Sequence, residues 1–208
     1  QVGDFTNYYK GNTSYFDPIL WKNNKQQQYD GYCSDIFAEN AVKFIEKNEN
    51  NPFFCYLSFN APHTPLQVPK KYYNIYKDLD PVVGFKDESL ASKMSEKDKE
   101  DARRIYGMVT NIDDNIGKVL NKLTELGIEE ETIIIFMTDN GPQQFRYNSN
   151  MKGLKGTVYN GGTRVPFYIK YAEKFKNSKV ISRMSAHIDI LPTILELCNL
   201  KIPSDRKI

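Results

Sequence analysis

Apolar residues recur along the chain at two spacings, one typical of helices and one typical of strands. A stripe at helical spacing follows Ser34 and predicts a helix from Ser34, as its cap, to about Asn48. A longer helix is predicted after Ser95, because Ser95 and Asp98 have the spacing of a capping box and Gly127 suits the left-handed residue that ends a helix. The expected buried residues are Ile36, Phe37, Ala41, Phe44 and Ile45 in the first helix, and Ile105, Met108, Val109, Ile112, Ile116, Val119, Leu120, Leu123 and Leu126 in the second.

Three short apolar runs predict strands. They cover residues 53–59, residues 132–138 and a stretch near 165–171. The second run is rich in β-branched residues, as expected of a strand that is buried on both faces. Helices that alternate with such strands predict an α/β sandwich with a largely parallel sheet, followed by a last helix at about 189–198. Residues 1–30 are expected to form a surface segment, and residues 78–94 a loop excursion.

Composition narrows the possible partners only slightly. The chain has 208 residues, 40% of them hydrophobic, and a formal net charge of +2. A basic stripe with interleaved aromatic residues is absent from the sequence, so we expect no nucleic-acid partner. The sequence also lacks an apolar run of the roughly 20 residues that a membrane helix needs, so no membrane span is expected.

The chain has three cysteines. Cys55 and Cys198 are expected to be small buried apolar residues. Cys33 lies at a helix start, where a thiol could be activated.

Asp139 and Asn140 directly follow the predicted strand 132–138. In open α/β sheets, ligands bind at the carboxyl ends of the strands. Carboxylate and amide oxygens side by side suit a hard cation such as Ca²⁺. The glycine-rich segment that follows contains Lys152, Lys155 and Arg164, and basic side chains of this kind suit a bound oxyanion. Glycines let the backbone bend tightly, which favours at least one of the two lysines pointing inward.

His63 occupies the equivalent place after the predicted strand 53–59, in a loop stiffened by two prolines. Because it shares this position with Asp139, we interpret His63 as a functional residue. His187, at the start of the last helix, is interpreted as a capping or packing residue. Asp113 and Asp114 lie in the middle of the long helix, where paired carboxylates more often form a solvated face, or a tether to a neighbouring loop, than an acid–base pair.

Together these segments resemble the sulfatase family, within the alkaline-phosphatase-like superfamily. The matching segments are residues 52–69, the long helix through Asn115-Ile116-Gly117, residues 136–142, residues 154–166 and residues 187–193, in the family's order and approximate spacing. The resemblance implies that Asp139 and Asn140 are two oxygen ligands of a calcium ion. It implies that Lys155 binds the sulfate and eases departure of the leaving alcohol, and that His63 contacts the sulfate beside it. Gly161, Gly162 and Arg164 resemble supporting residues of the loop.

The sequence also departs from the family's pattern. Family members carry a Cys-x-Pro/Ala-Ser/Thr-Arg motif whose cysteine becomes formylglycine, the nucleophile, with two further aspartate ligands upstream. None of Cys33, Cys55 and Cys198 has that context. We therefore interpret residues 1–208 as the middle and later part of a sulfatase catalytic domain that is inactive by itself. A phosphoric-ester hydrolase of the same superfamily and a non-catalytic binding or accessory domain remain alternatives.

The resemblance implies a sulfate ester as substrate, with a sulfated carbohydrate as one candidate, and an exported protein, periplasmic or extracellular. An incomplete sheet would leave apolar edges open, and self-association through those edges is expected.

Overall fold

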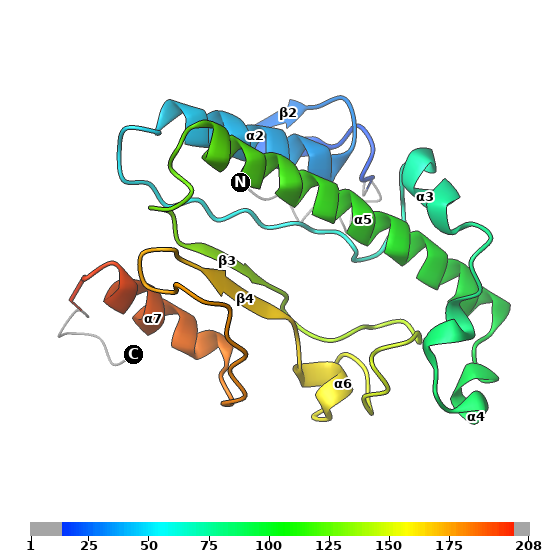
Figure 1. Ribbon diagram of the computed structural model, residues 1–208. Helices are drawn as coiled ribbons and strands as arrows, with labels where there is room; N and C mark the ends of the chain where they lie inside the picture. The colour runs from blue at the N-terminus through cyan, green and yellow to red at the C-terminus, as the bar shows by residue number, and fades with distance from the viewer. Residues whose placement is uncertain (1–13, 202–208) are drawn as a thin grey trace. The chain divides into compact units, whose positions relative to one another are not determined.

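A computed structural model describes residues 14–201 of the chain (Figure 1). The chain divides into two compact units, residues 1–174 and residues 175–208. The first unit contains the strands β1 (Ile19–Lys22), β2 (Lys25–Gln28), β3 (Ile134–Met137) and β4 (Phe167–Lys170), and the helices α2 (Cys33–Lys47), α3 (Lys70–Tyr76), η1 (Pro81–Gly84), α4 (Glu88–Ala91), α5 (Glu96–Glu125) and α6 (Asn160–Thr163). The second contains η2 (His187–Asp189) and α7 (Ile190–Leu197).

Helix α5 is the longest element of the first unit, and its two predicted ends are confirmed. Ser95 Oγ accepts the backbone N–H of Asp98, and the Asp98 carboxylate accepts the backbone N–H of Ser95 at 3.0 Å. This reciprocal capping box satisfies two of the amides that a helix start leaves without partners. At the other end, Gly127 has φ +71, the left-handed conformation that glycine adopts at low cost.

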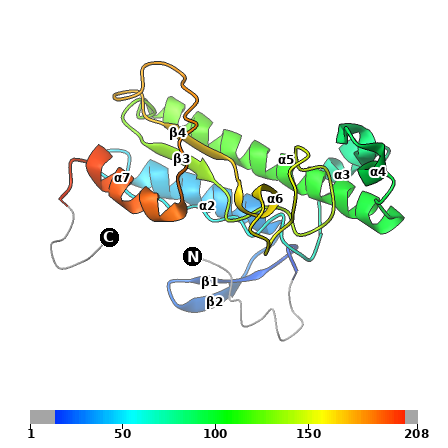
Figure 2. The same cartoon turned by 90° about the horizontal axis from the view of Figure 1, so that it is seen from below.

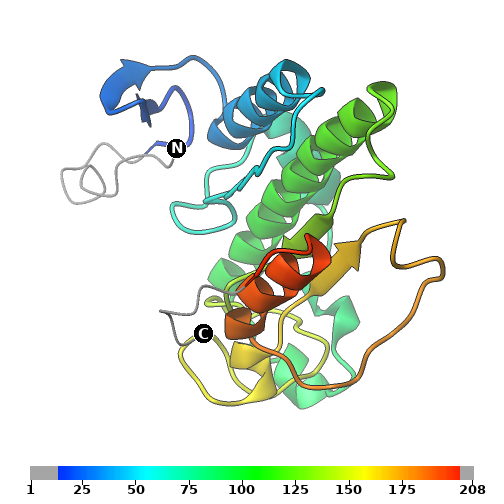
Figure 3. The ribbon, with the colours of Figure 1, turned by 90° about the vertical axis from the view of Figure 1, so that its left-hand side faces the viewer.

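Helices α2 and α5 run side by side, as Figures 1 and 3 both show, and their interface contains a buried polar cluster. Asn111 and Asn115 of α5 are fully buried, and each donates its side-chain amide to Asp35 Oδ1 at 2.7 Å. Lys118 Nζ donates to Asn115 Oδ1 at 2.9 Å. Because a buried amide is costly unless it is hydrogen-bonded, the bonds of Asn111 and Asn115 to the half-buried Asp35 fix one register between the two helices.

The predicted N-cap of α2 was wrong by two residues. The helix begins at Cys33 after Tyr32, and Ser34 is a fully buried residue of the first turn that caps nothing. Ile36, Ala41 and Ile45 are buried as predicted, whereas Phe44 is exposed, because the face of α2 toward α5 is centred on its alanines. The sequence pattern missed this, since an alanine contributes little to an apolar stripe.

The strands of the described residues form two antiparallel pairs at separate places in the first unit (Figures 1 and 2). Strands β1 and β2 form a hairpin inside the predicted surface segment, with Asn23 and Asn24 at positive φ in its two-residue turn. Strand β3 pairs with β4 so that Phe136 lies opposite Tyr168. The parallel pairs that we predicted are absent from residues 14–201, and β3 is half-buried rather than buried on both faces.

Residues 53–59, predicted as a strand, lie in an extended segment that pairs with no described strand. None of the backbone hydrogen bonds between described residues involves this segment. Phe54 is 72% exposed and Tyr56 is 70% exposed. Cys55 and also Cys198 are exposed, so the prediction that both are buried was wrong. Among residues 14–201 both edges of this strand-like segment are therefore open, and its large apolar side chains lie in solvent.

The excursion 78–94 contains two short helices, η1 and α4, where the sequence predicted a loop. Each is capped by an aspartate, because Asp80 accepts from Val82 N at 3.3 Å and Asp87 accepts from Ser89 N at 2.8 Å. The excursion packs on the loop after β3 through the ring of Phe85, which lies 5.8 Å from the ring of Phe145.

Within the described part of the chain, each helix is too short or too polar to cross a membrane.

Two glycines of α5 provide a matched test of this packing. A Cβ on Gly107 would lie 2.9 Å from Val68 Cγ2 and 3.2 Å from the Tyr72 backbone, whereas a Cβ on Gly117 would meet no atom within 4 Å. Gly107→Ala should lower the free energy of unfolding by about 1–3 kcal/mol, because α3 must move away from α5. Gly117→Ala should raise it by about 0.5–1 kcal/mol, because alanine favours the helix. Urea denaturation of both variants checks this, and equal effects of the two substitutions would contradict the packing.

Candidate anion and metal site

The loop that follows β3 presents two oxygen-bearing side chains in sequence. The Asp139 carboxylate is exposed and accepts the backbone N–H of Asn140 through Oδ1 at 2.9 Å. The Asn140 side-chain amide donates to the other carboxylate oxygen, Oδ2. These bonds hold the two side chains against each other, with the Asn140 carbonyl oxygen and the remaining lone pairs of Asp139 left for a ligand.

Three segments after β3 are joined by backbone hydrogen bonds into one assembly, which we call the glycine junction: residues 139–142, 152–157 and 160–163. Gly141 N donates to Gly162 O at 2.9 Å, Lys155 N donates to Pro142 O at 2.8 Å, and Gly161 N donates to Lys152 O at 2.7 Å. The junction therefore fixes the backbone of Lys155 next to the loop that carries Asp139 and Asn140.

The junction depends on glycine because its backbones are in direct contact. A Cβ on Gly141 would lie 1.8 Å from Gly161 O, and a Cβ on Gly161 would lie 2.1 Å from Gly153 O. Real Cβ atoms do not approach backbone oxygens this closely, so any other residue would force the segments apart. This is the physical reason for the glycines that the sequence places at these positions.

The structure distinguishes the two lysines of the loop. Lys152 Nζ lies 4.1 Å from the ring centroid of Tyr159, so its charge is held by a cation–π contact. Lys155 is exposed, and its ammonium makes no hydrogen bond or ion pair with any other residue in 14–201. Of the two, Lys155 is the one whose charge is available to an incoming anion.

His63 lies on a different loop, between residues 53–59 and α3, and is exposed. Its Nδ1 is 2.8 Å from Thr64 O, and Tyr15 donates its hydroxyl to His63 O at 3.0 Å. A carbonyl oxygen can only accept, so Nδ1 carries a proton in this contact. The ring then donates to an oxyanion through Nε2 only as the imidazolium. The approach of His63 to Lys155 stays a prediction.

The other residues singled out in the sequence have structural contacts. Asp114 accepts the hydroxyl of Tyr72 at 2.8 Å and so tethers helix α3 to α5, whereas the expected tether was to a neighbouring loop. His187 begins η2 in the second unit. Burial raises the pKa of the Cys33 thiol to about 12, so Cys33 stays protonated and is not an activated nucleophile.

Arg146 was not among the residues singled out in the sequence. It is a half-buried basic residue in the loop between β3 and the glycine-rich segment. A basic residue so close to that segment was the signal that could have drawn attention to it.

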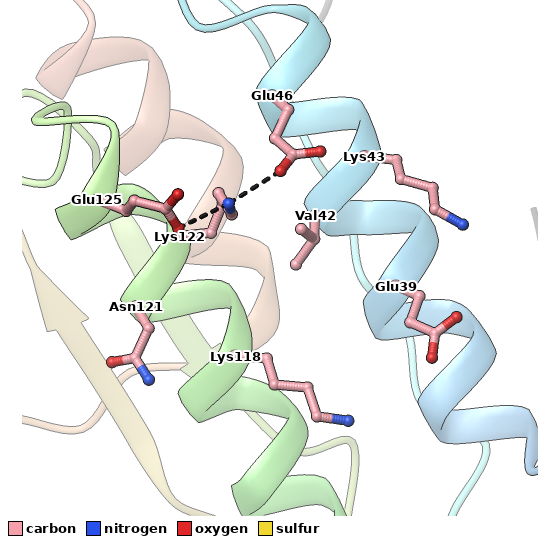
Figure 4. A pocket seen from close by; sticks show the side chains of 8 residues that line it. All are labelled: Glu39, Val42, Lys43, Glu46, Lys118, Asn121, Lys122 and Glu125. Atoms are coloured by element: carbon pink, nitrogen blue, oxygen red, sulfur yellow. Dashed lines mark ion pairs between the residues drawn. The ribbon is translucent and has the colours of Figure 1, made fainter.

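A groove between α2 and α5 is a separate feature of the first unit (Figure 4). Its walls carry Lys122, whose ammonium pairs with Glu46 at 2.9 Å and Glu125 at 2.7 Å. Lys43 and Glu39 also line it. Its acidic and basic side chains are balanced, and none of the candidate site residues lies in its lining.

The donor set after β3 fits a calcium ion in type but not in number. Asp139 and Asn140 offer carboxylate and amide oxygens, which are the ligands that hard cations prefer. A calcium shell needs roughly six to eight oxygens. Within residues 14–201 no group of three or more His, Cys, Asp or Glu side chains is placed to hold a metal. Asp139 and Asn140 therefore offer only two of the oxygens that such a shell would need.

Comparisons with known proteins show the family to which the chain belongs. The family model for sulfatases matches residues 2–200, so the chain belongs to the sulfatase family. It is 33% identical over 198 residues to an arylsulfatase of Clostridium perfringens, with 83% of this chain and 40% of that protein covered. It is 30% identical over 192 residues to an ulvan-active sulfatase of Formosa agariphila, with 89% of this chain and 37% of that protein covered.

A solved structure shares the fold. The crystal structure of Ps i-CgsB in complex with k-i-k-neocarrahexaose superposes with a TM-score of 0.75 at 29% identity, over 90% of this chain and 38% of that one. The expected α/β class of alkaline-phosphatase-like architecture is confirmed, and the described sheets are parts of it. The chain spans 34% to 40% of the length of three of its curated relatives.

Calcium binding should be weak and should depend on Asp139. With two side-chain ligands of a larger shell, we expect residues 1–208 to bind Ca²⁺ with a dissociation constant above about 10⁻³ M. Asp139→Ala should abolish this binding, whereas Asp113→Ala, at an exposed helical carboxylate, should leave it unchanged. Isothermal titration calorimetry checks the prediction. Tight binding of Zn²⁺ without any binding of Ca²⁺ would contradict it and favour a phosphoric-ester hydrolase.

Proposed function

We propose that residues 1–208 contribute the anion-binding and part of the metal-binding machinery of a sulfuric ester hydrolase of the arylsulfatase type. The observation that carries the proposal is the glycine junction, which holds the Lys155 backbone against Pro142, two residues after Asn140, while the Lys155 side chain stays exposed. Membership of the sulfatase family supports the assignment of this chemistry.

Each side chain has a distinct role in this proposal. The Lys155 ammonium binds a sulfate oxygen and offsets the charge that develops as the leaving alcohol departs. His63, as the imidazolium, donates through Nε2 to a second sulfate oxygen. Asp139 and Asn140 hold a calcium ion, which when bound would offset negative charge on the sulfate.

The nucleophile is not found among the residues of this chain. Cys33 is buried with a raised pKa, and Cys55 and Cys198 are exposed but lack the sequence context that would mark them for modification to formylglycine. The cysteines present do not fit that group, so we assign no attacking atom. We expect residues 1–208 alone not to hydrolyse sulfate esters, because losing one member of a catalytic unit removes most of what the unit does.

The substrate class and the setting are part of the same proposal. A sulfated carbohydrate is the candidate substrate, and the names of two relatives, a structure in complex with neocarrahexaose and an ulvan-active sulfatase, support it. Export follows from the family resemblance alone. Exposed Phe54, Tyr56 and Tyr168 support self-association of the isolated chain through its open strand edges.

Substitutions at the two lysines and at His63 test the proposed function. In a full-length sulfatase that contains these residues, Lys155→Ala and His63→Ala should each lower kcat/KM for an aryl sulfate by roughly a hundredfold or more, the loss expected for one preorganised charge-stabilising group. Lys152→Ala is the matched control and should have a much smaller effect, because Tyr159 already holds that charge. An essential Lys152 together with a dispensable Lys155 would show that the roles in this loop are assigned wrongly.

A further inference from the structure

Arg146 is a charged side chain of the loop after β3 to which the reaction assigns no role. It is half-buried, and no ion pair or hydrogen bond joins it to another residue in 14–201. Burial lowers the pKa of its guanidinium, and the nearby Tyr106 hydroxyl partly opposes this effect. A partly desolvated cation without a carboxylate partner is costly, which favours an anion from outside the described residues.

The position of Arg146 ties it to the glycine junction. It lies four residues after Pro142, whose carbonyl accepts the Lys155 N–H, and two residues before Asn148. The Asn148 side-chain amide donates to Gly153 O at 3.2 Å. Both flanks of Arg146 are thus anchored on the backbone that positions Lys155.

An aromatic cluster surrounds this part of the loop. The rings of Phe145 and Phe85 stack at 5.8 Å, and Tyr147 meets Phe85 edge-on at 5.8 Å. Gly84 of the excursion lies against the Tyr147 ring, since a Cβ there would be 2.6 Å from Tyr147 Cγ. Tyr147 nevertheless remains 37% exposed. A ring covered on one side and open on the other suits the apolar face of a sugar.

The charge of the loop favours an anionic ligand with more than one charged group. Residues 139–163 contain one acidic side chain, Asp139, against the three basic side chains Arg146, Lys152 and Lys155. Lys152 is held by Tyr159, and Lys155 serves the reacting sulfate in the proposed function. Arg146 is the remaining positive charge, and its planar fork matches a sulfate or a carboxylate.

We propose that Arg146 forms a second anion subsite, which binds a further sulfate or carboxylate group of a saccharide substrate while the open part of Tyr147 packs on the sugar. This proposal rests on the proposed function, because it presupposes that Lys155 receives the reacting sulfate. It makes the substrate a polyanionic saccharide rather than a singly charged ester. Arg146 is a binding residue here and takes no part in bond cleavage.

The test compares a singly and a doubly charged ligand. ¹⁵N-labelled residues 1–208, with Ca²⁺ present, are titrated with glucose 6-sulfate and with glucose 2,6-disulfate, and dissociation constants are taken from amide shifts. Arg146→Met keeps the aliphatic stem and removes the charge. It should weaken binding of the disulfate by roughly tenfold, the scale of one charge-assisted contact, and change the monosulfate less than twofold. Arg146→Lys should restore part of the difference.

Two further variants separate the possible outcomes. Arg104→Ala removes an arginine that is paired with Glu100 at 2.8 Å on α5, and it should affect neither ligand. Lys155→Ala should weaken both ligands. Two results would show that Arg146 only packs beside Tyr106. In one, Arg146→Met has the same dissociation constants as the unsubstituted chain for both ligands. In the other, Arg146→Met weakens the binding of both ligands by the same factor. If Arg146→Met selectively weakens the disulfate but Lys155→Ala changes nothing, the proposed function fails while the subsite stands. Failure of both ligands to bind would overturn both.

Discussion

Direct contact between backbones in the glycine junction is the constraint on which the rest of the candidate site depends. Gly141 and Gly161 approach so closely that neither position has room for a Cβ. The hydrogen bond from Lys155 N to Pro142 O then fixes where the lysine leaves the loop relative to Asp139 and Asn140. Glycines in the three segments of the junction thus let the Lys155 backbone lie against Pro142, two residues after Asn140, which a residue with a side chain at Gly141 or Gly161 would prevent.

Basic residues of the same loop that look equivalent in the sequence have different contacts in the structure. Lys152 and Lys155 are three residues apart among glycines, yet one lies over the ring of Tyr159 and the other is left for an anion. Arg146 is a third positive charge, half-buried and near the Tyr106 hydroxyl of α5. These differences arise from the contacts of Tyr159 with Lys152 and of Tyr106 with Arg146, which no local pattern encodes. They leave the charges of Lys155 and Arg146, but not that of Lys152, without a cation–π or ion-pair partner among residues 14–201.

The ends of a helix could be predicted from the sequence, because they depend on residues within one turn. The pairing of a strand could not, because it depends on segments that lie elsewhere in the structure. The ends of α5 followed from Ser95, Asp98 and Gly127, because a capping box and a left-handed glycine act within one turn. Residues 53–59 have the composition of a buried strand, but a strand needs partners, and among the described residues they have none. The site residues were predicted from motif order and stay a prediction, whereas the different contacts of Lys152 and Lys155 became visible only in the structure.

Amide hydrogen exchange of the Gly161→Ala variant of residues 1–208, followed by NMR, tests most directly whether the junction positions Lys155. The account predicts that the amides of Gly141, Lys155 and residue 161 lose protection together, because the added Cβ drives Gly153 O away and opens all three bonds. Amides inside α5 should keep their protection, and Gly117→Ala serves as the control with free space around its Cβ. Retained protection at Lys155 while residue 161 exchanges freely would contradict the account.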